Sequence, residues 1–287
     1  MLPKNCISHE SLALSPNVFR KEEPMLPYLY AIKTRLLVAF AYRFEILTSI
    51  CLQLLIMFSK YFFWVSAYGD QGIIADTSLS QMIDYSVLSM LLAIFYSISV
   101  EGSIKQSIRG GNVAVEFIKP VSVMGMYFAA DVAGIIANFF TKFIPIFLIA
   151  SLCFGVPIPA SFPALLLFIA GSLMGFLLQW TIAAIFGLFS FWVIELGPIG
   201  TIKSHIINLL AGVLVPLWLF PAWLSEGLKF LPFLYIVQAP VSVYIGKISI
   251  SEGLFGLAVQ AVWVVILFCA MNALKKRAFR NVIVQGG

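Results

Sequence analysis

Long apolar runs separated by short polar interruptions dominate the chain from residue 44 onward. A bilayer core about 30 Å thick requires roughly 20 apolar residues in a helix. The runs that approach this length predict six membrane-spanning helices, at about residues 44–68, 82–103, 127–154, 162–194, 206–220 and 253–274. The predicted fold class is therefore an all-α membrane protein.

The stretch from residue 143 to residue 194 contains no charged residue and is too long for a single crossing. Gly155, Pro157 and Pro159 lie in its middle. Because Gly and Pro interrupt helices, they favour a turn at this point. We therefore expect the third and fourth spans to form a helical hairpin.

The segment before the first span has a different pattern. Within residues 26–43, apolar residues recur at helical spacing, while Lys33 and Arg35 interrupt them and Arg43 closes the segment. This pattern predicts an amphipathic helix on the membrane surface, with its cations toward the anionic cytoplasmic leaflet. The alternative is that the segment is the irregular start of the first span.

Two further segments complete the predicted organisation. Residues 1–25 are polar, lack the apolar core of a secretory signal and are predicted to form a cytosolic tail, so the transmembrane domain covers residues 26–287. Residues 220–248 are apolar but are interrupted by Pro221, Pro232 and Pro240. We expect short re-entrant helices in this segment, between spans five and six.

The composition agrees with a lipid environment. The chain of 287 residues is 61% hydrophobic and only 11% charged, and its mean hydropathy is +1.00. A soluble domain carries about 25% charged residues. The net charge of +5 does not indicate a nucleic-acid partner, because the basic residues lie in short loops between apolar runs, where they set membrane orientation.

The distribution of basic residues predicts the orientation. With six spans, all but four of the 18 Lys and Arg residues lie on the side of the two termini; the exceptions are Lys60, Lys142, Lys229 and Lys247. Positive charge is retained on the cytosolic side of a membrane. Both termini and residues 105–120 are therefore predicted to be cytosolic, and residues 220–248 external.

The sequence lacks the motifs of common catalytic sites. It contains no GxxxxGK[ST] phosphate loop, no GxSxG and no HExxH. Its two histidines are far apart, and its four cysteines form no CxxC pair. We therefore predict no catalytic residue, no metal site and no cofactor bound by this chain, and we do not expect the chain to be an enzyme.

Three local patterns occur in order along the chain. The first is the surface segment, which runs through Tyr42-Arg43-Phe44 directly into the first span. The second is residues 107–121, where a basic turn with two glycines precedes hydrophobic residues, a Lys and a Pro. The third is the external segment with Trp223, Pro232 and Phe233. In this order the patterns resemble the permease subunit of type-2 ATP-binding-cassette exporters. The narrower resemblance is to a bacterial subgroup whose small stand-alone permeases work with a separate ATPase.

This resemblance implies roles for particular segments. Residues 26–43 would be the elbow helix, and the cytosolic loop 105–120 would be a coupling helix that docks in a groove of the ATPase. The residues implied in this contact are Arg109, Val113, Val115, Glu116, Phe117, Ile118 and Lys119. The alternative is a solvated loop whose charges only fix the topology.

The resemblance also implies the partners. Two nucleotide-binding ATPase subunits would carry ATP and Mg. A second permease subunit, identical or a sister chain, would complete a multi-pass assembly in the cell inner membrane. Lys142 is the candidate for a charge that faces the pathway, although it could equally extend toward the outer leaflet. The alternative function is an ATP-independent secondary transporter or a channel-like protein. Such carriers tend to have internal repeats and paired polar sites, neither of which is clear here.

Overall fold

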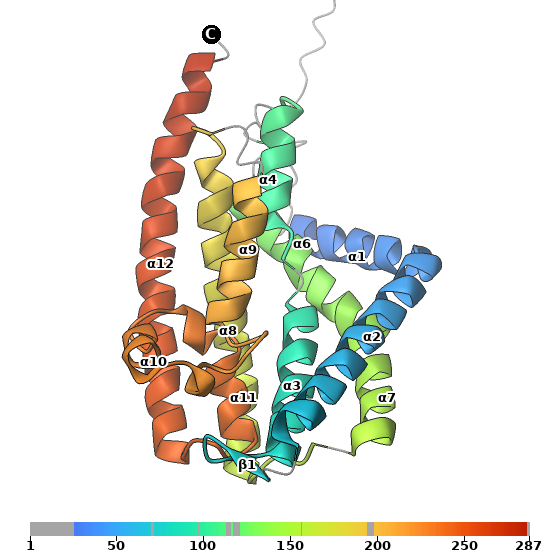
Figure 1. Cartoon of the computed structure of the whole chain (residues 1–287). Coiled ribbons are helices and arrows are strands. Elements are labelled where there is room, and N and C mark those ends of the chain that lie inside the picture. The colour runs from blue at the N-terminus through green and yellow to red at the C-terminus, as the bar shows by residue number, and fades with distance from the viewer. Residues whose placement is uncertain are drawn as a thin grey trace, which may run out of the picture.

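The chain is almost entirely helical. The structure, a computed structural model, describes residues 26–69, 72–96, 98–112, 116, 121–155, 157–193 and 198–285. Long helices run roughly side by side along one direction (Figure 1). The described residues contain one small sheet, an antiparallel pair of strands β1 (Ile73–Ile74) and β2 (Thr77–Ser78). This architecture confirms the predicted helical class.

Five helical stretches are long and apolar enough to cross a membrane. They are Arg43–Tyr68, Leu79–Arg109, Val123–Phe154, Phe162–Phe189 and Ile250–Ala278. The first is the single helix α2 (Arg43–Tyr68), and the second consists of α3 (Leu79–Phe95) and α4 (Val100–Arg109). The third consists of α6 (Val123–Asn138), the π-helical turn η2 (Phe139–Phe143) and α7 (Ile144–Phe154). The fourth is α8 (Phe162–Phe189), and the last lies within α12 (Ile250–Gln285).

Two helices end at other residues than predicted, because hydropathy alone does not determine where a helix ends. Helix α8 ends at Phe189, whereas the uncharged run continues to residue 194. Helix α12 continues through Lys275, Lys276 and Arg277 to Gln285. Charged residues end an apolar run but do not break a helix, because Lys and Arg are good helix formers.

The fifth predicted span, residues 206–220, is not among the five long helices. In its place α9 (Pro198–Leu210) begins earlier and has only 13 residues, which corresponds to about 20 Å. The helix ends where Gly212 takes a left-handed backbone conformation, with φ of +77°, and Pro216 lacks the amide hydrogen that would continue the ladder.

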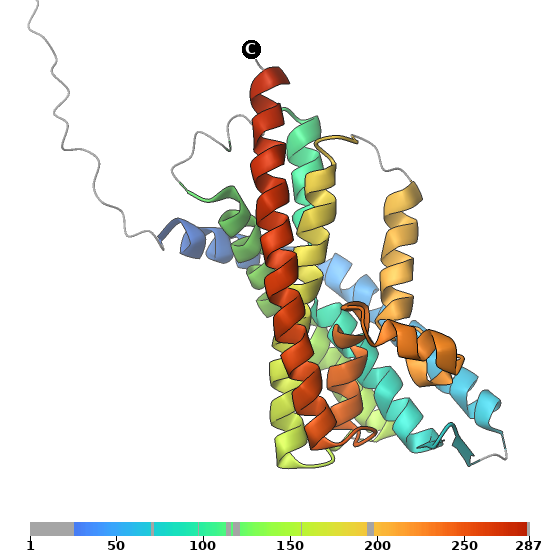
Figure 2. The same ribbon diagram turned by 90° about the vertical axis from the view of Figure 1, so that its left-hand side faces the viewer.

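Four short helices follow α9. They are η3 (Leu217–Leu219), α10 (Ala222–Leu228), η4 (Phe233–Tyr235) and α11 (Gln238–Tyr244). Figures 1 and 2 show that α9 and this segment together return the chain from the end where α8 finishes to the end where α12 begins. Tyr244 fixes the far end of the segment, since its carbonyl accepts a 2.9 Å hydrogen bond from Ala160 N–H in the turn before α8.

Side chains of neighbouring helices satisfy the backbone groups that this broken path leaves without helical partners. Lys60 Nζ donates to the Val213 carbonyl at 2.6 Å, and Tyr85 Oη donates to that of Gly212 at 2.7 Å. Further bonds run from Leu217 N–H to Gln238 Oε1 (2.8 Å) and from Gln260 Nε2 to the carbonyls of Tyr235 (2.6 Å) and Gly171 (2.9 Å). Irregular backbone at membrane depth requires such internal partners, because lipid supplies none.

Helix α1 (Leu26–Ala41) ends one residue before α2, and the two helices meet at Tyr42. Figure 1 shows α1 at a steep angle to the long helices. It packs on the start of α6, where Tyr28 Oη accepts a 3.3 Å hydrogen bond from Ser122 N–H. Gly125 permits this contact, because a Cβ at Gly125 would lie 3.0 Å from the Tyr28 ring.

The core is built around α8, which packs on α12, on α4 and on α11. Leu178 of α8 and Ile236, which follows η4, are buried in it. The closest approach is at Gly175, where a Cβ would lie 2.4 Å from the Ile236 carbonyl oxygen and 2.6 Å from Tyr96 Oη. Only glycine therefore allows α8 to pack at this distance.

We expect Gly175→Ala to destabilise the protein by about 1–3 kcal/mol, the usual cost of inserting a methyl group into a packed core. The measurement is the Tm of the purified chain in detergent. Gly102→Ala is the matched control, because an added Cβ at Gly102 meets no atom within 4 Å. Equal Tm values for the two variants would contradict the packing described here.

Candidate functional site

A buried carboxylate connects three helices at the start of α4. Asp131 of α6 is only 1% exposed. Its Oδ1 accepts hydrogen bonds from Ser99 N–H at 2.8 Å and Ser99 Oγ at 2.6 Å. Its Oδ2 accepts from Val100 N–H at 3.1 Å and from Trp180 Nε1 of α8 at 3.0 Å. Both oxygens are thus fully used.

The position of Asp131 explains why α4 is a separate helix. Helix α3 ends at Phe95, and α4 begins at Val100. A new helix begins with free N–H groups and a partial positive charge. The Asp131 carboxylate accepts hydrogen bonds from two of these N–H groups. Its negative charge also interacts favourably with the positive end of the helix dipole. A residue of α6 therefore fixes the point at which α4 starts.

Helix α4 is also held along its length. Val100 and Ile104 are fully buried, and α4 packs closely on α8 at Gly187. A Cβ at Gly187 would lie 2.8 Å from Ile104 Cδ1 and 3.1 Å from Glu101 Cα. Glycine at this position therefore allows α4 and α8 to approach more closely than any larger residue would.

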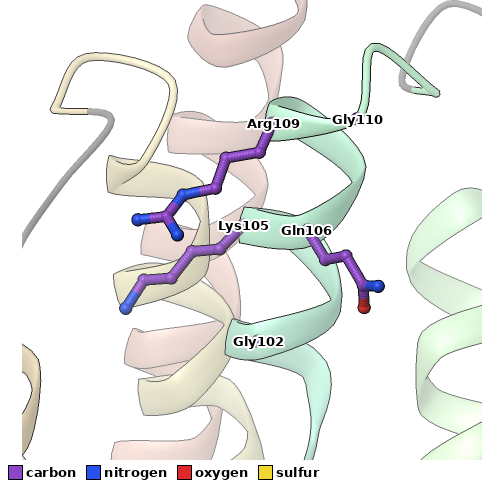
Figure 3. Close-up of a pocket in the computed structure, with 5 residues that line it drawn as sticks. All are labelled: Gly102, Lys105, Gln106, Arg109 and Gly110. Carbon is purple, nitrogen blue, oxygen red and sulfur yellow. The ribbon is translucent and has the colours of Figure 1, made fainter.

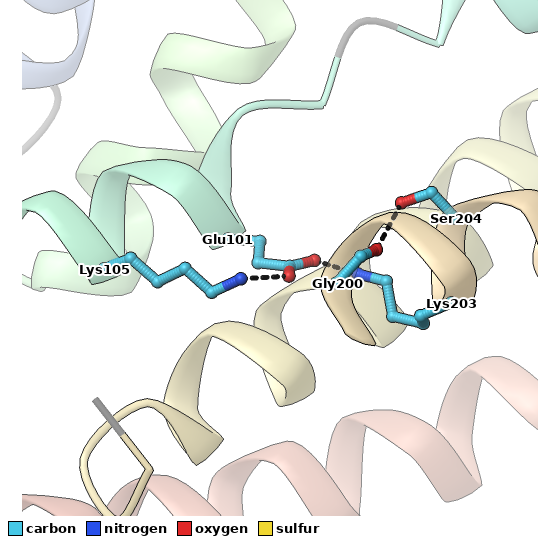
Figure 4. A network of polar contacts seen from close by, with 5 residues as sticks. All are labelled: Glu101, Lys105, Gly200, Lys203 and Ser204. Atoms are coloured by element: carbon cyan, nitrogen blue, oxygen red, sulfur yellow. Dashed lines mark hydrogen bonds and ion pairs between the residues drawn. The ribbon is translucent and has the colours of Figure 1, made fainter. Parts of the chain in front are cut away.

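An ion-pair network joins α4 to α9 (Figure 4). Glu101 Oε1 lies 2.7 Å from Lys105 Nζ, one turn along α4, and Glu101 Oε2 pairs with Lys203 Nζ of α9. Lys203 Nζ also lies 4.7 Å from the centre of the Phe186 ring of α8. These side chains are less than one quarter exposed, where an ion pair contributes more than on an open surface.

The end of α4 carries a basic groove of about 560 Å³, lined by Gly102, Lys105, Gln106, Arg109 and Gly110 (Figure 3). Figure 3 shows Lys105 and Arg109 extending to the same side of the helix and Gln106 to the other. The groove borders the segment predicted to contact an ATPase. An acidic partner surface would complement its charge.

The structure describes only part of the predicted coupling set. Arg109 is the last residue of α4, so the predicted loop 105–120 begins inside a helix. Glu116 Oε2 accepts a 2.7 Å hydrogen bond from Tyr127 Oη of α6, which holds it against the bundle. Val113, Val115, Phe117, Ile118 and Lys119 lie outside the described residues.

The other predicted residues are dispersed over the molecule. Lys33 and Arg35 are exposed on α1, and Arg43 is exposed at the start of α2. Lys142 is half-buried in η2. In the external segment, Trp223 is 76% exposed on α10, whereas Pro232 is buried and Phe233 of η4 is half-buried.

The sequence alone did not reveal two of the contacts at this site. Glu101 and Lys203 are 102 positions apart, and no local spacing connects them. The capping role of Asp131 could not be predicted either, because its partners Ser99 and Trp180 lie 32 and 49 positions away in the sequence. Asp131 itself could be noticed as a carboxylate within an apolar run, where an ionisable group requires partners.

The fold and the site define a multi-pass membrane protein whose described residues hold no group of His, Cys, Asp or Glu suited to a metal. A family model described as ABC-2 family transporter protein matches residues 54–286, which is most of the chain, and the chain belongs to this family. It is thus a permease-type transport component. A search of curated proteins gave no match.

We expect Asp131→Asn to lower the free energy of unfolding by about 1.5–3 kcal/mol, since the amide nitrogen would face donors in place of a carboxylate oxygen. The Tm in detergent measures the effect. Asp84→Asn on α3 is the matched isosteric control, because Asp84 accepts no hydrogen bond from a described residue. A Tm of Asp131→Asn as high as that of the control would refute the capping role.

Proposed function

We propose that the chain is the membrane-spanning subunit of an ATP-driven exporter, which forms the translocation pathway and is driven by a separate ATPase bound at the cytosolic end of α4. The observation that carries this proposal is the fixation of α4 by Asp131. The ABC-2 family membership supports the permease role. The lack of a phosphate loop in the sequence is consistent with ATP and Mg being held by a partner.

The contacts of α4 suit it to transmit force. Its first residue is capped by Asp131 of α6, its side packs on α8 at Gly187, and Glu101 links it to Lys203 of α9. Its ten residues extend about 15 Å. A displacement of the Arg109 end would therefore move the cytosolic ends of α6, α8 and α9 together.

The proposed topology has six crossings. The five long helices make five of them, and α9 with the short helices up to α11 makes the remaining crossing as a broken path. The last turns of α4 and of α12 lie toward the same end of the molecule (Figures 1 and 2). Because α4 ends at Arg109 and α12 contains Lys275, Lys276 and Arg277, this arrangement supports cytosolic termini in the inner membrane. In this arrangement α1 is the elbow helix at the cytosolic surface.

The proposed assembly contains two permease chains and two ATPase subunits, as the resemblance to the bacterial stand-alone subgroup implies. The large exposed apolar side chains of α2, such as Leu55, Phe62 and Phe63, suit contact with lipid or with the second permease. An ATP-independent carrier remains the rival function, and the experiments below separate the two.

We expect the double change Val115→Asp and Phe117→Asp to reduce co-purification of the ATPase subunit in mild detergent at least tenfold, because two charges would replace apolar contacts. Ile73→Asp is the control: it places the same charge on an exposed apolar residue of β1 at the opposite end. Undiminished recovery of the ATPase with the double variant would reject the docking site.

Glu101→Gln separates transmission from docking. We expect the ATPase to co-purify as before, while the ATP hydrolysis of the complex falls severalfold because α4 and α9 lose their ionic link. The charge swap Glu101→Lys with Lys203→Glu is expected to restore part of the activity. Glu226→Gln, which breaks the exposed Glu226–Lys229 pair, is the control and should change nothing. Normal hydrolysis by Glu101→Gln would contradict the linkage.

A further inference from the structure

A polar cavity of about 370 Å³ lies in the angle between α1, α2 and α6, away from the groove on α4. Its polar lining includes Arg35 of α1, Glu45 of α2, Asn138 of α6, and Thr141 and Lys142 of η2. Figure 1 shows that α1 departs from α2 at a steep angle and lies beside α6. The volume lies within the range of about 300–1,000 Å³ typical of ligand sites.

Two cationic side chains, Arg35 and Lys142, line the cavity. Within the described part of the chain, neither Arg35 nor Lys142 forms a hydrogen bond or an ion pair. Of the two carboxylates in the lining, Asp131 directs both oxygens to Ser99, Val100 and Trp180. The formal charges of the lining balance, but among the described side chains Arg35 and Lys142 have no acceptor and the Glu45 carboxylate has no donor. A zwitterionic ligand with a phosphate and an amine would supply both.

The floor of the cavity has an unusual backbone. The helix passes from α-helical to π-helical geometry over Phe139–Phe143, and single π-helical turns often occur at functional sites. Ala130, Gly134 and Ala137 line the preceding part of the floor, and Val38 and Ile46 line the opposite side. The lining therefore combines apolar side chains with the polar and charged side chains of Asp131, Asn138 and Lys142, and this mixture suits an amphiphile.

The surroundings favour the bilayer as the source of that amphiphile. The elements that form the angle also expose large apolar side chains: Leu37 and Phe40 of α1 and Phe44 of α2, the last at 79%. Because these side chains require lipid contact, a lipid is the molecule present at the mouth of the cavity at the highest local concentration.

We propose that this cavity binds the phosphate-bearing headgroup of a membrane phospholipid. Arg35 and Lys142 donate to the phosphate oxygens, and Glu45 accepts from the amine of an ethanolamine headgroup. The acyl chains lie against the part of the cavity that Ala130, Gly134 and Ala137 line. The proposal depends on membrane contact by α1 and not on ATPase coupling, so failure of either leaves the other standing.

The test is native mass spectrometry of the delipidated full-length chain titrated with phosphatidylethanolamine, phosphatidylglycerol or inorganic phosphate. We expect Arg35→Gln and Lys142→Gln each to weaken lipid binding about tenfold. Glu45→Gln should reduce the preference for the ethanolamine over the glycerol headgroup. Lys33→Gln is the matched control, since Lys33 is exposed on the same helix and does not line the cavity.

A conservative variant distinguishes loss of lipid binding from loss of the fold. Lys142→Arg retains the cation, so its lipid binding should remain close to that of the unaltered chain and its Tm should match that of Lys142→Gln. Lipid affinities of Arg35→Gln and Lys142→Gln equal to that of Lys33→Gln would overturn the proposal. Displacement of the lipid by an equal concentration of inorganic phosphate would overturn the assignment to a lipid headgroup.

Discussion

The interaction on which the rest of the structure depends is the cap that Asp131 places on the start of α4. A carboxylate that is 1% exposed is costly to bury in an apolar bundle unless every lone pair is used. Here Ser99, Val100 and Trp180 use them. The same contacts join α4, α6 and α8 at one point. A single buried group therefore determines where α4 begins.

A second constraint shapes the opposite half of the molecule. The chain returns toward α12 through short helices, and lipid offers no partner for the backbone groups that these helices leave free. Lys60, Tyr85 and Gln260 supply the missing hydrogen bonds from three long helices. These bonds position the broken segment, and it also packs on α8 and α12.

Hydropathy and charge predicted the helical class and five of the six expected spans well, because long apolar runs have few alternative structures. They were less successful at residues 206–220, where Gly212 and Pro216 end α9 early although the run remains apolar. Only part of the candidate site could be predicted from the sequence. Arg109 was identified as a candidate from the local pattern of residues 105–120. The pairing of Glu101 with Lys203 could not be predicted, because it depends on how distant helices pack.

In the proposed function, the chain is a pathway and transmission subunit that is inactive without a nucleotide-binding partner. The most direct measurement is ATP hydrolysis in proteoliposomes that contain either the purified chain alone or the complex recovered in mild detergent. We predict no hydrolysis by the chain alone and ATP hydrolysis by the complex. Hydrolysis by the chain alone, or transport driven by a proton gradient in the absence of ATP, would contradict the account.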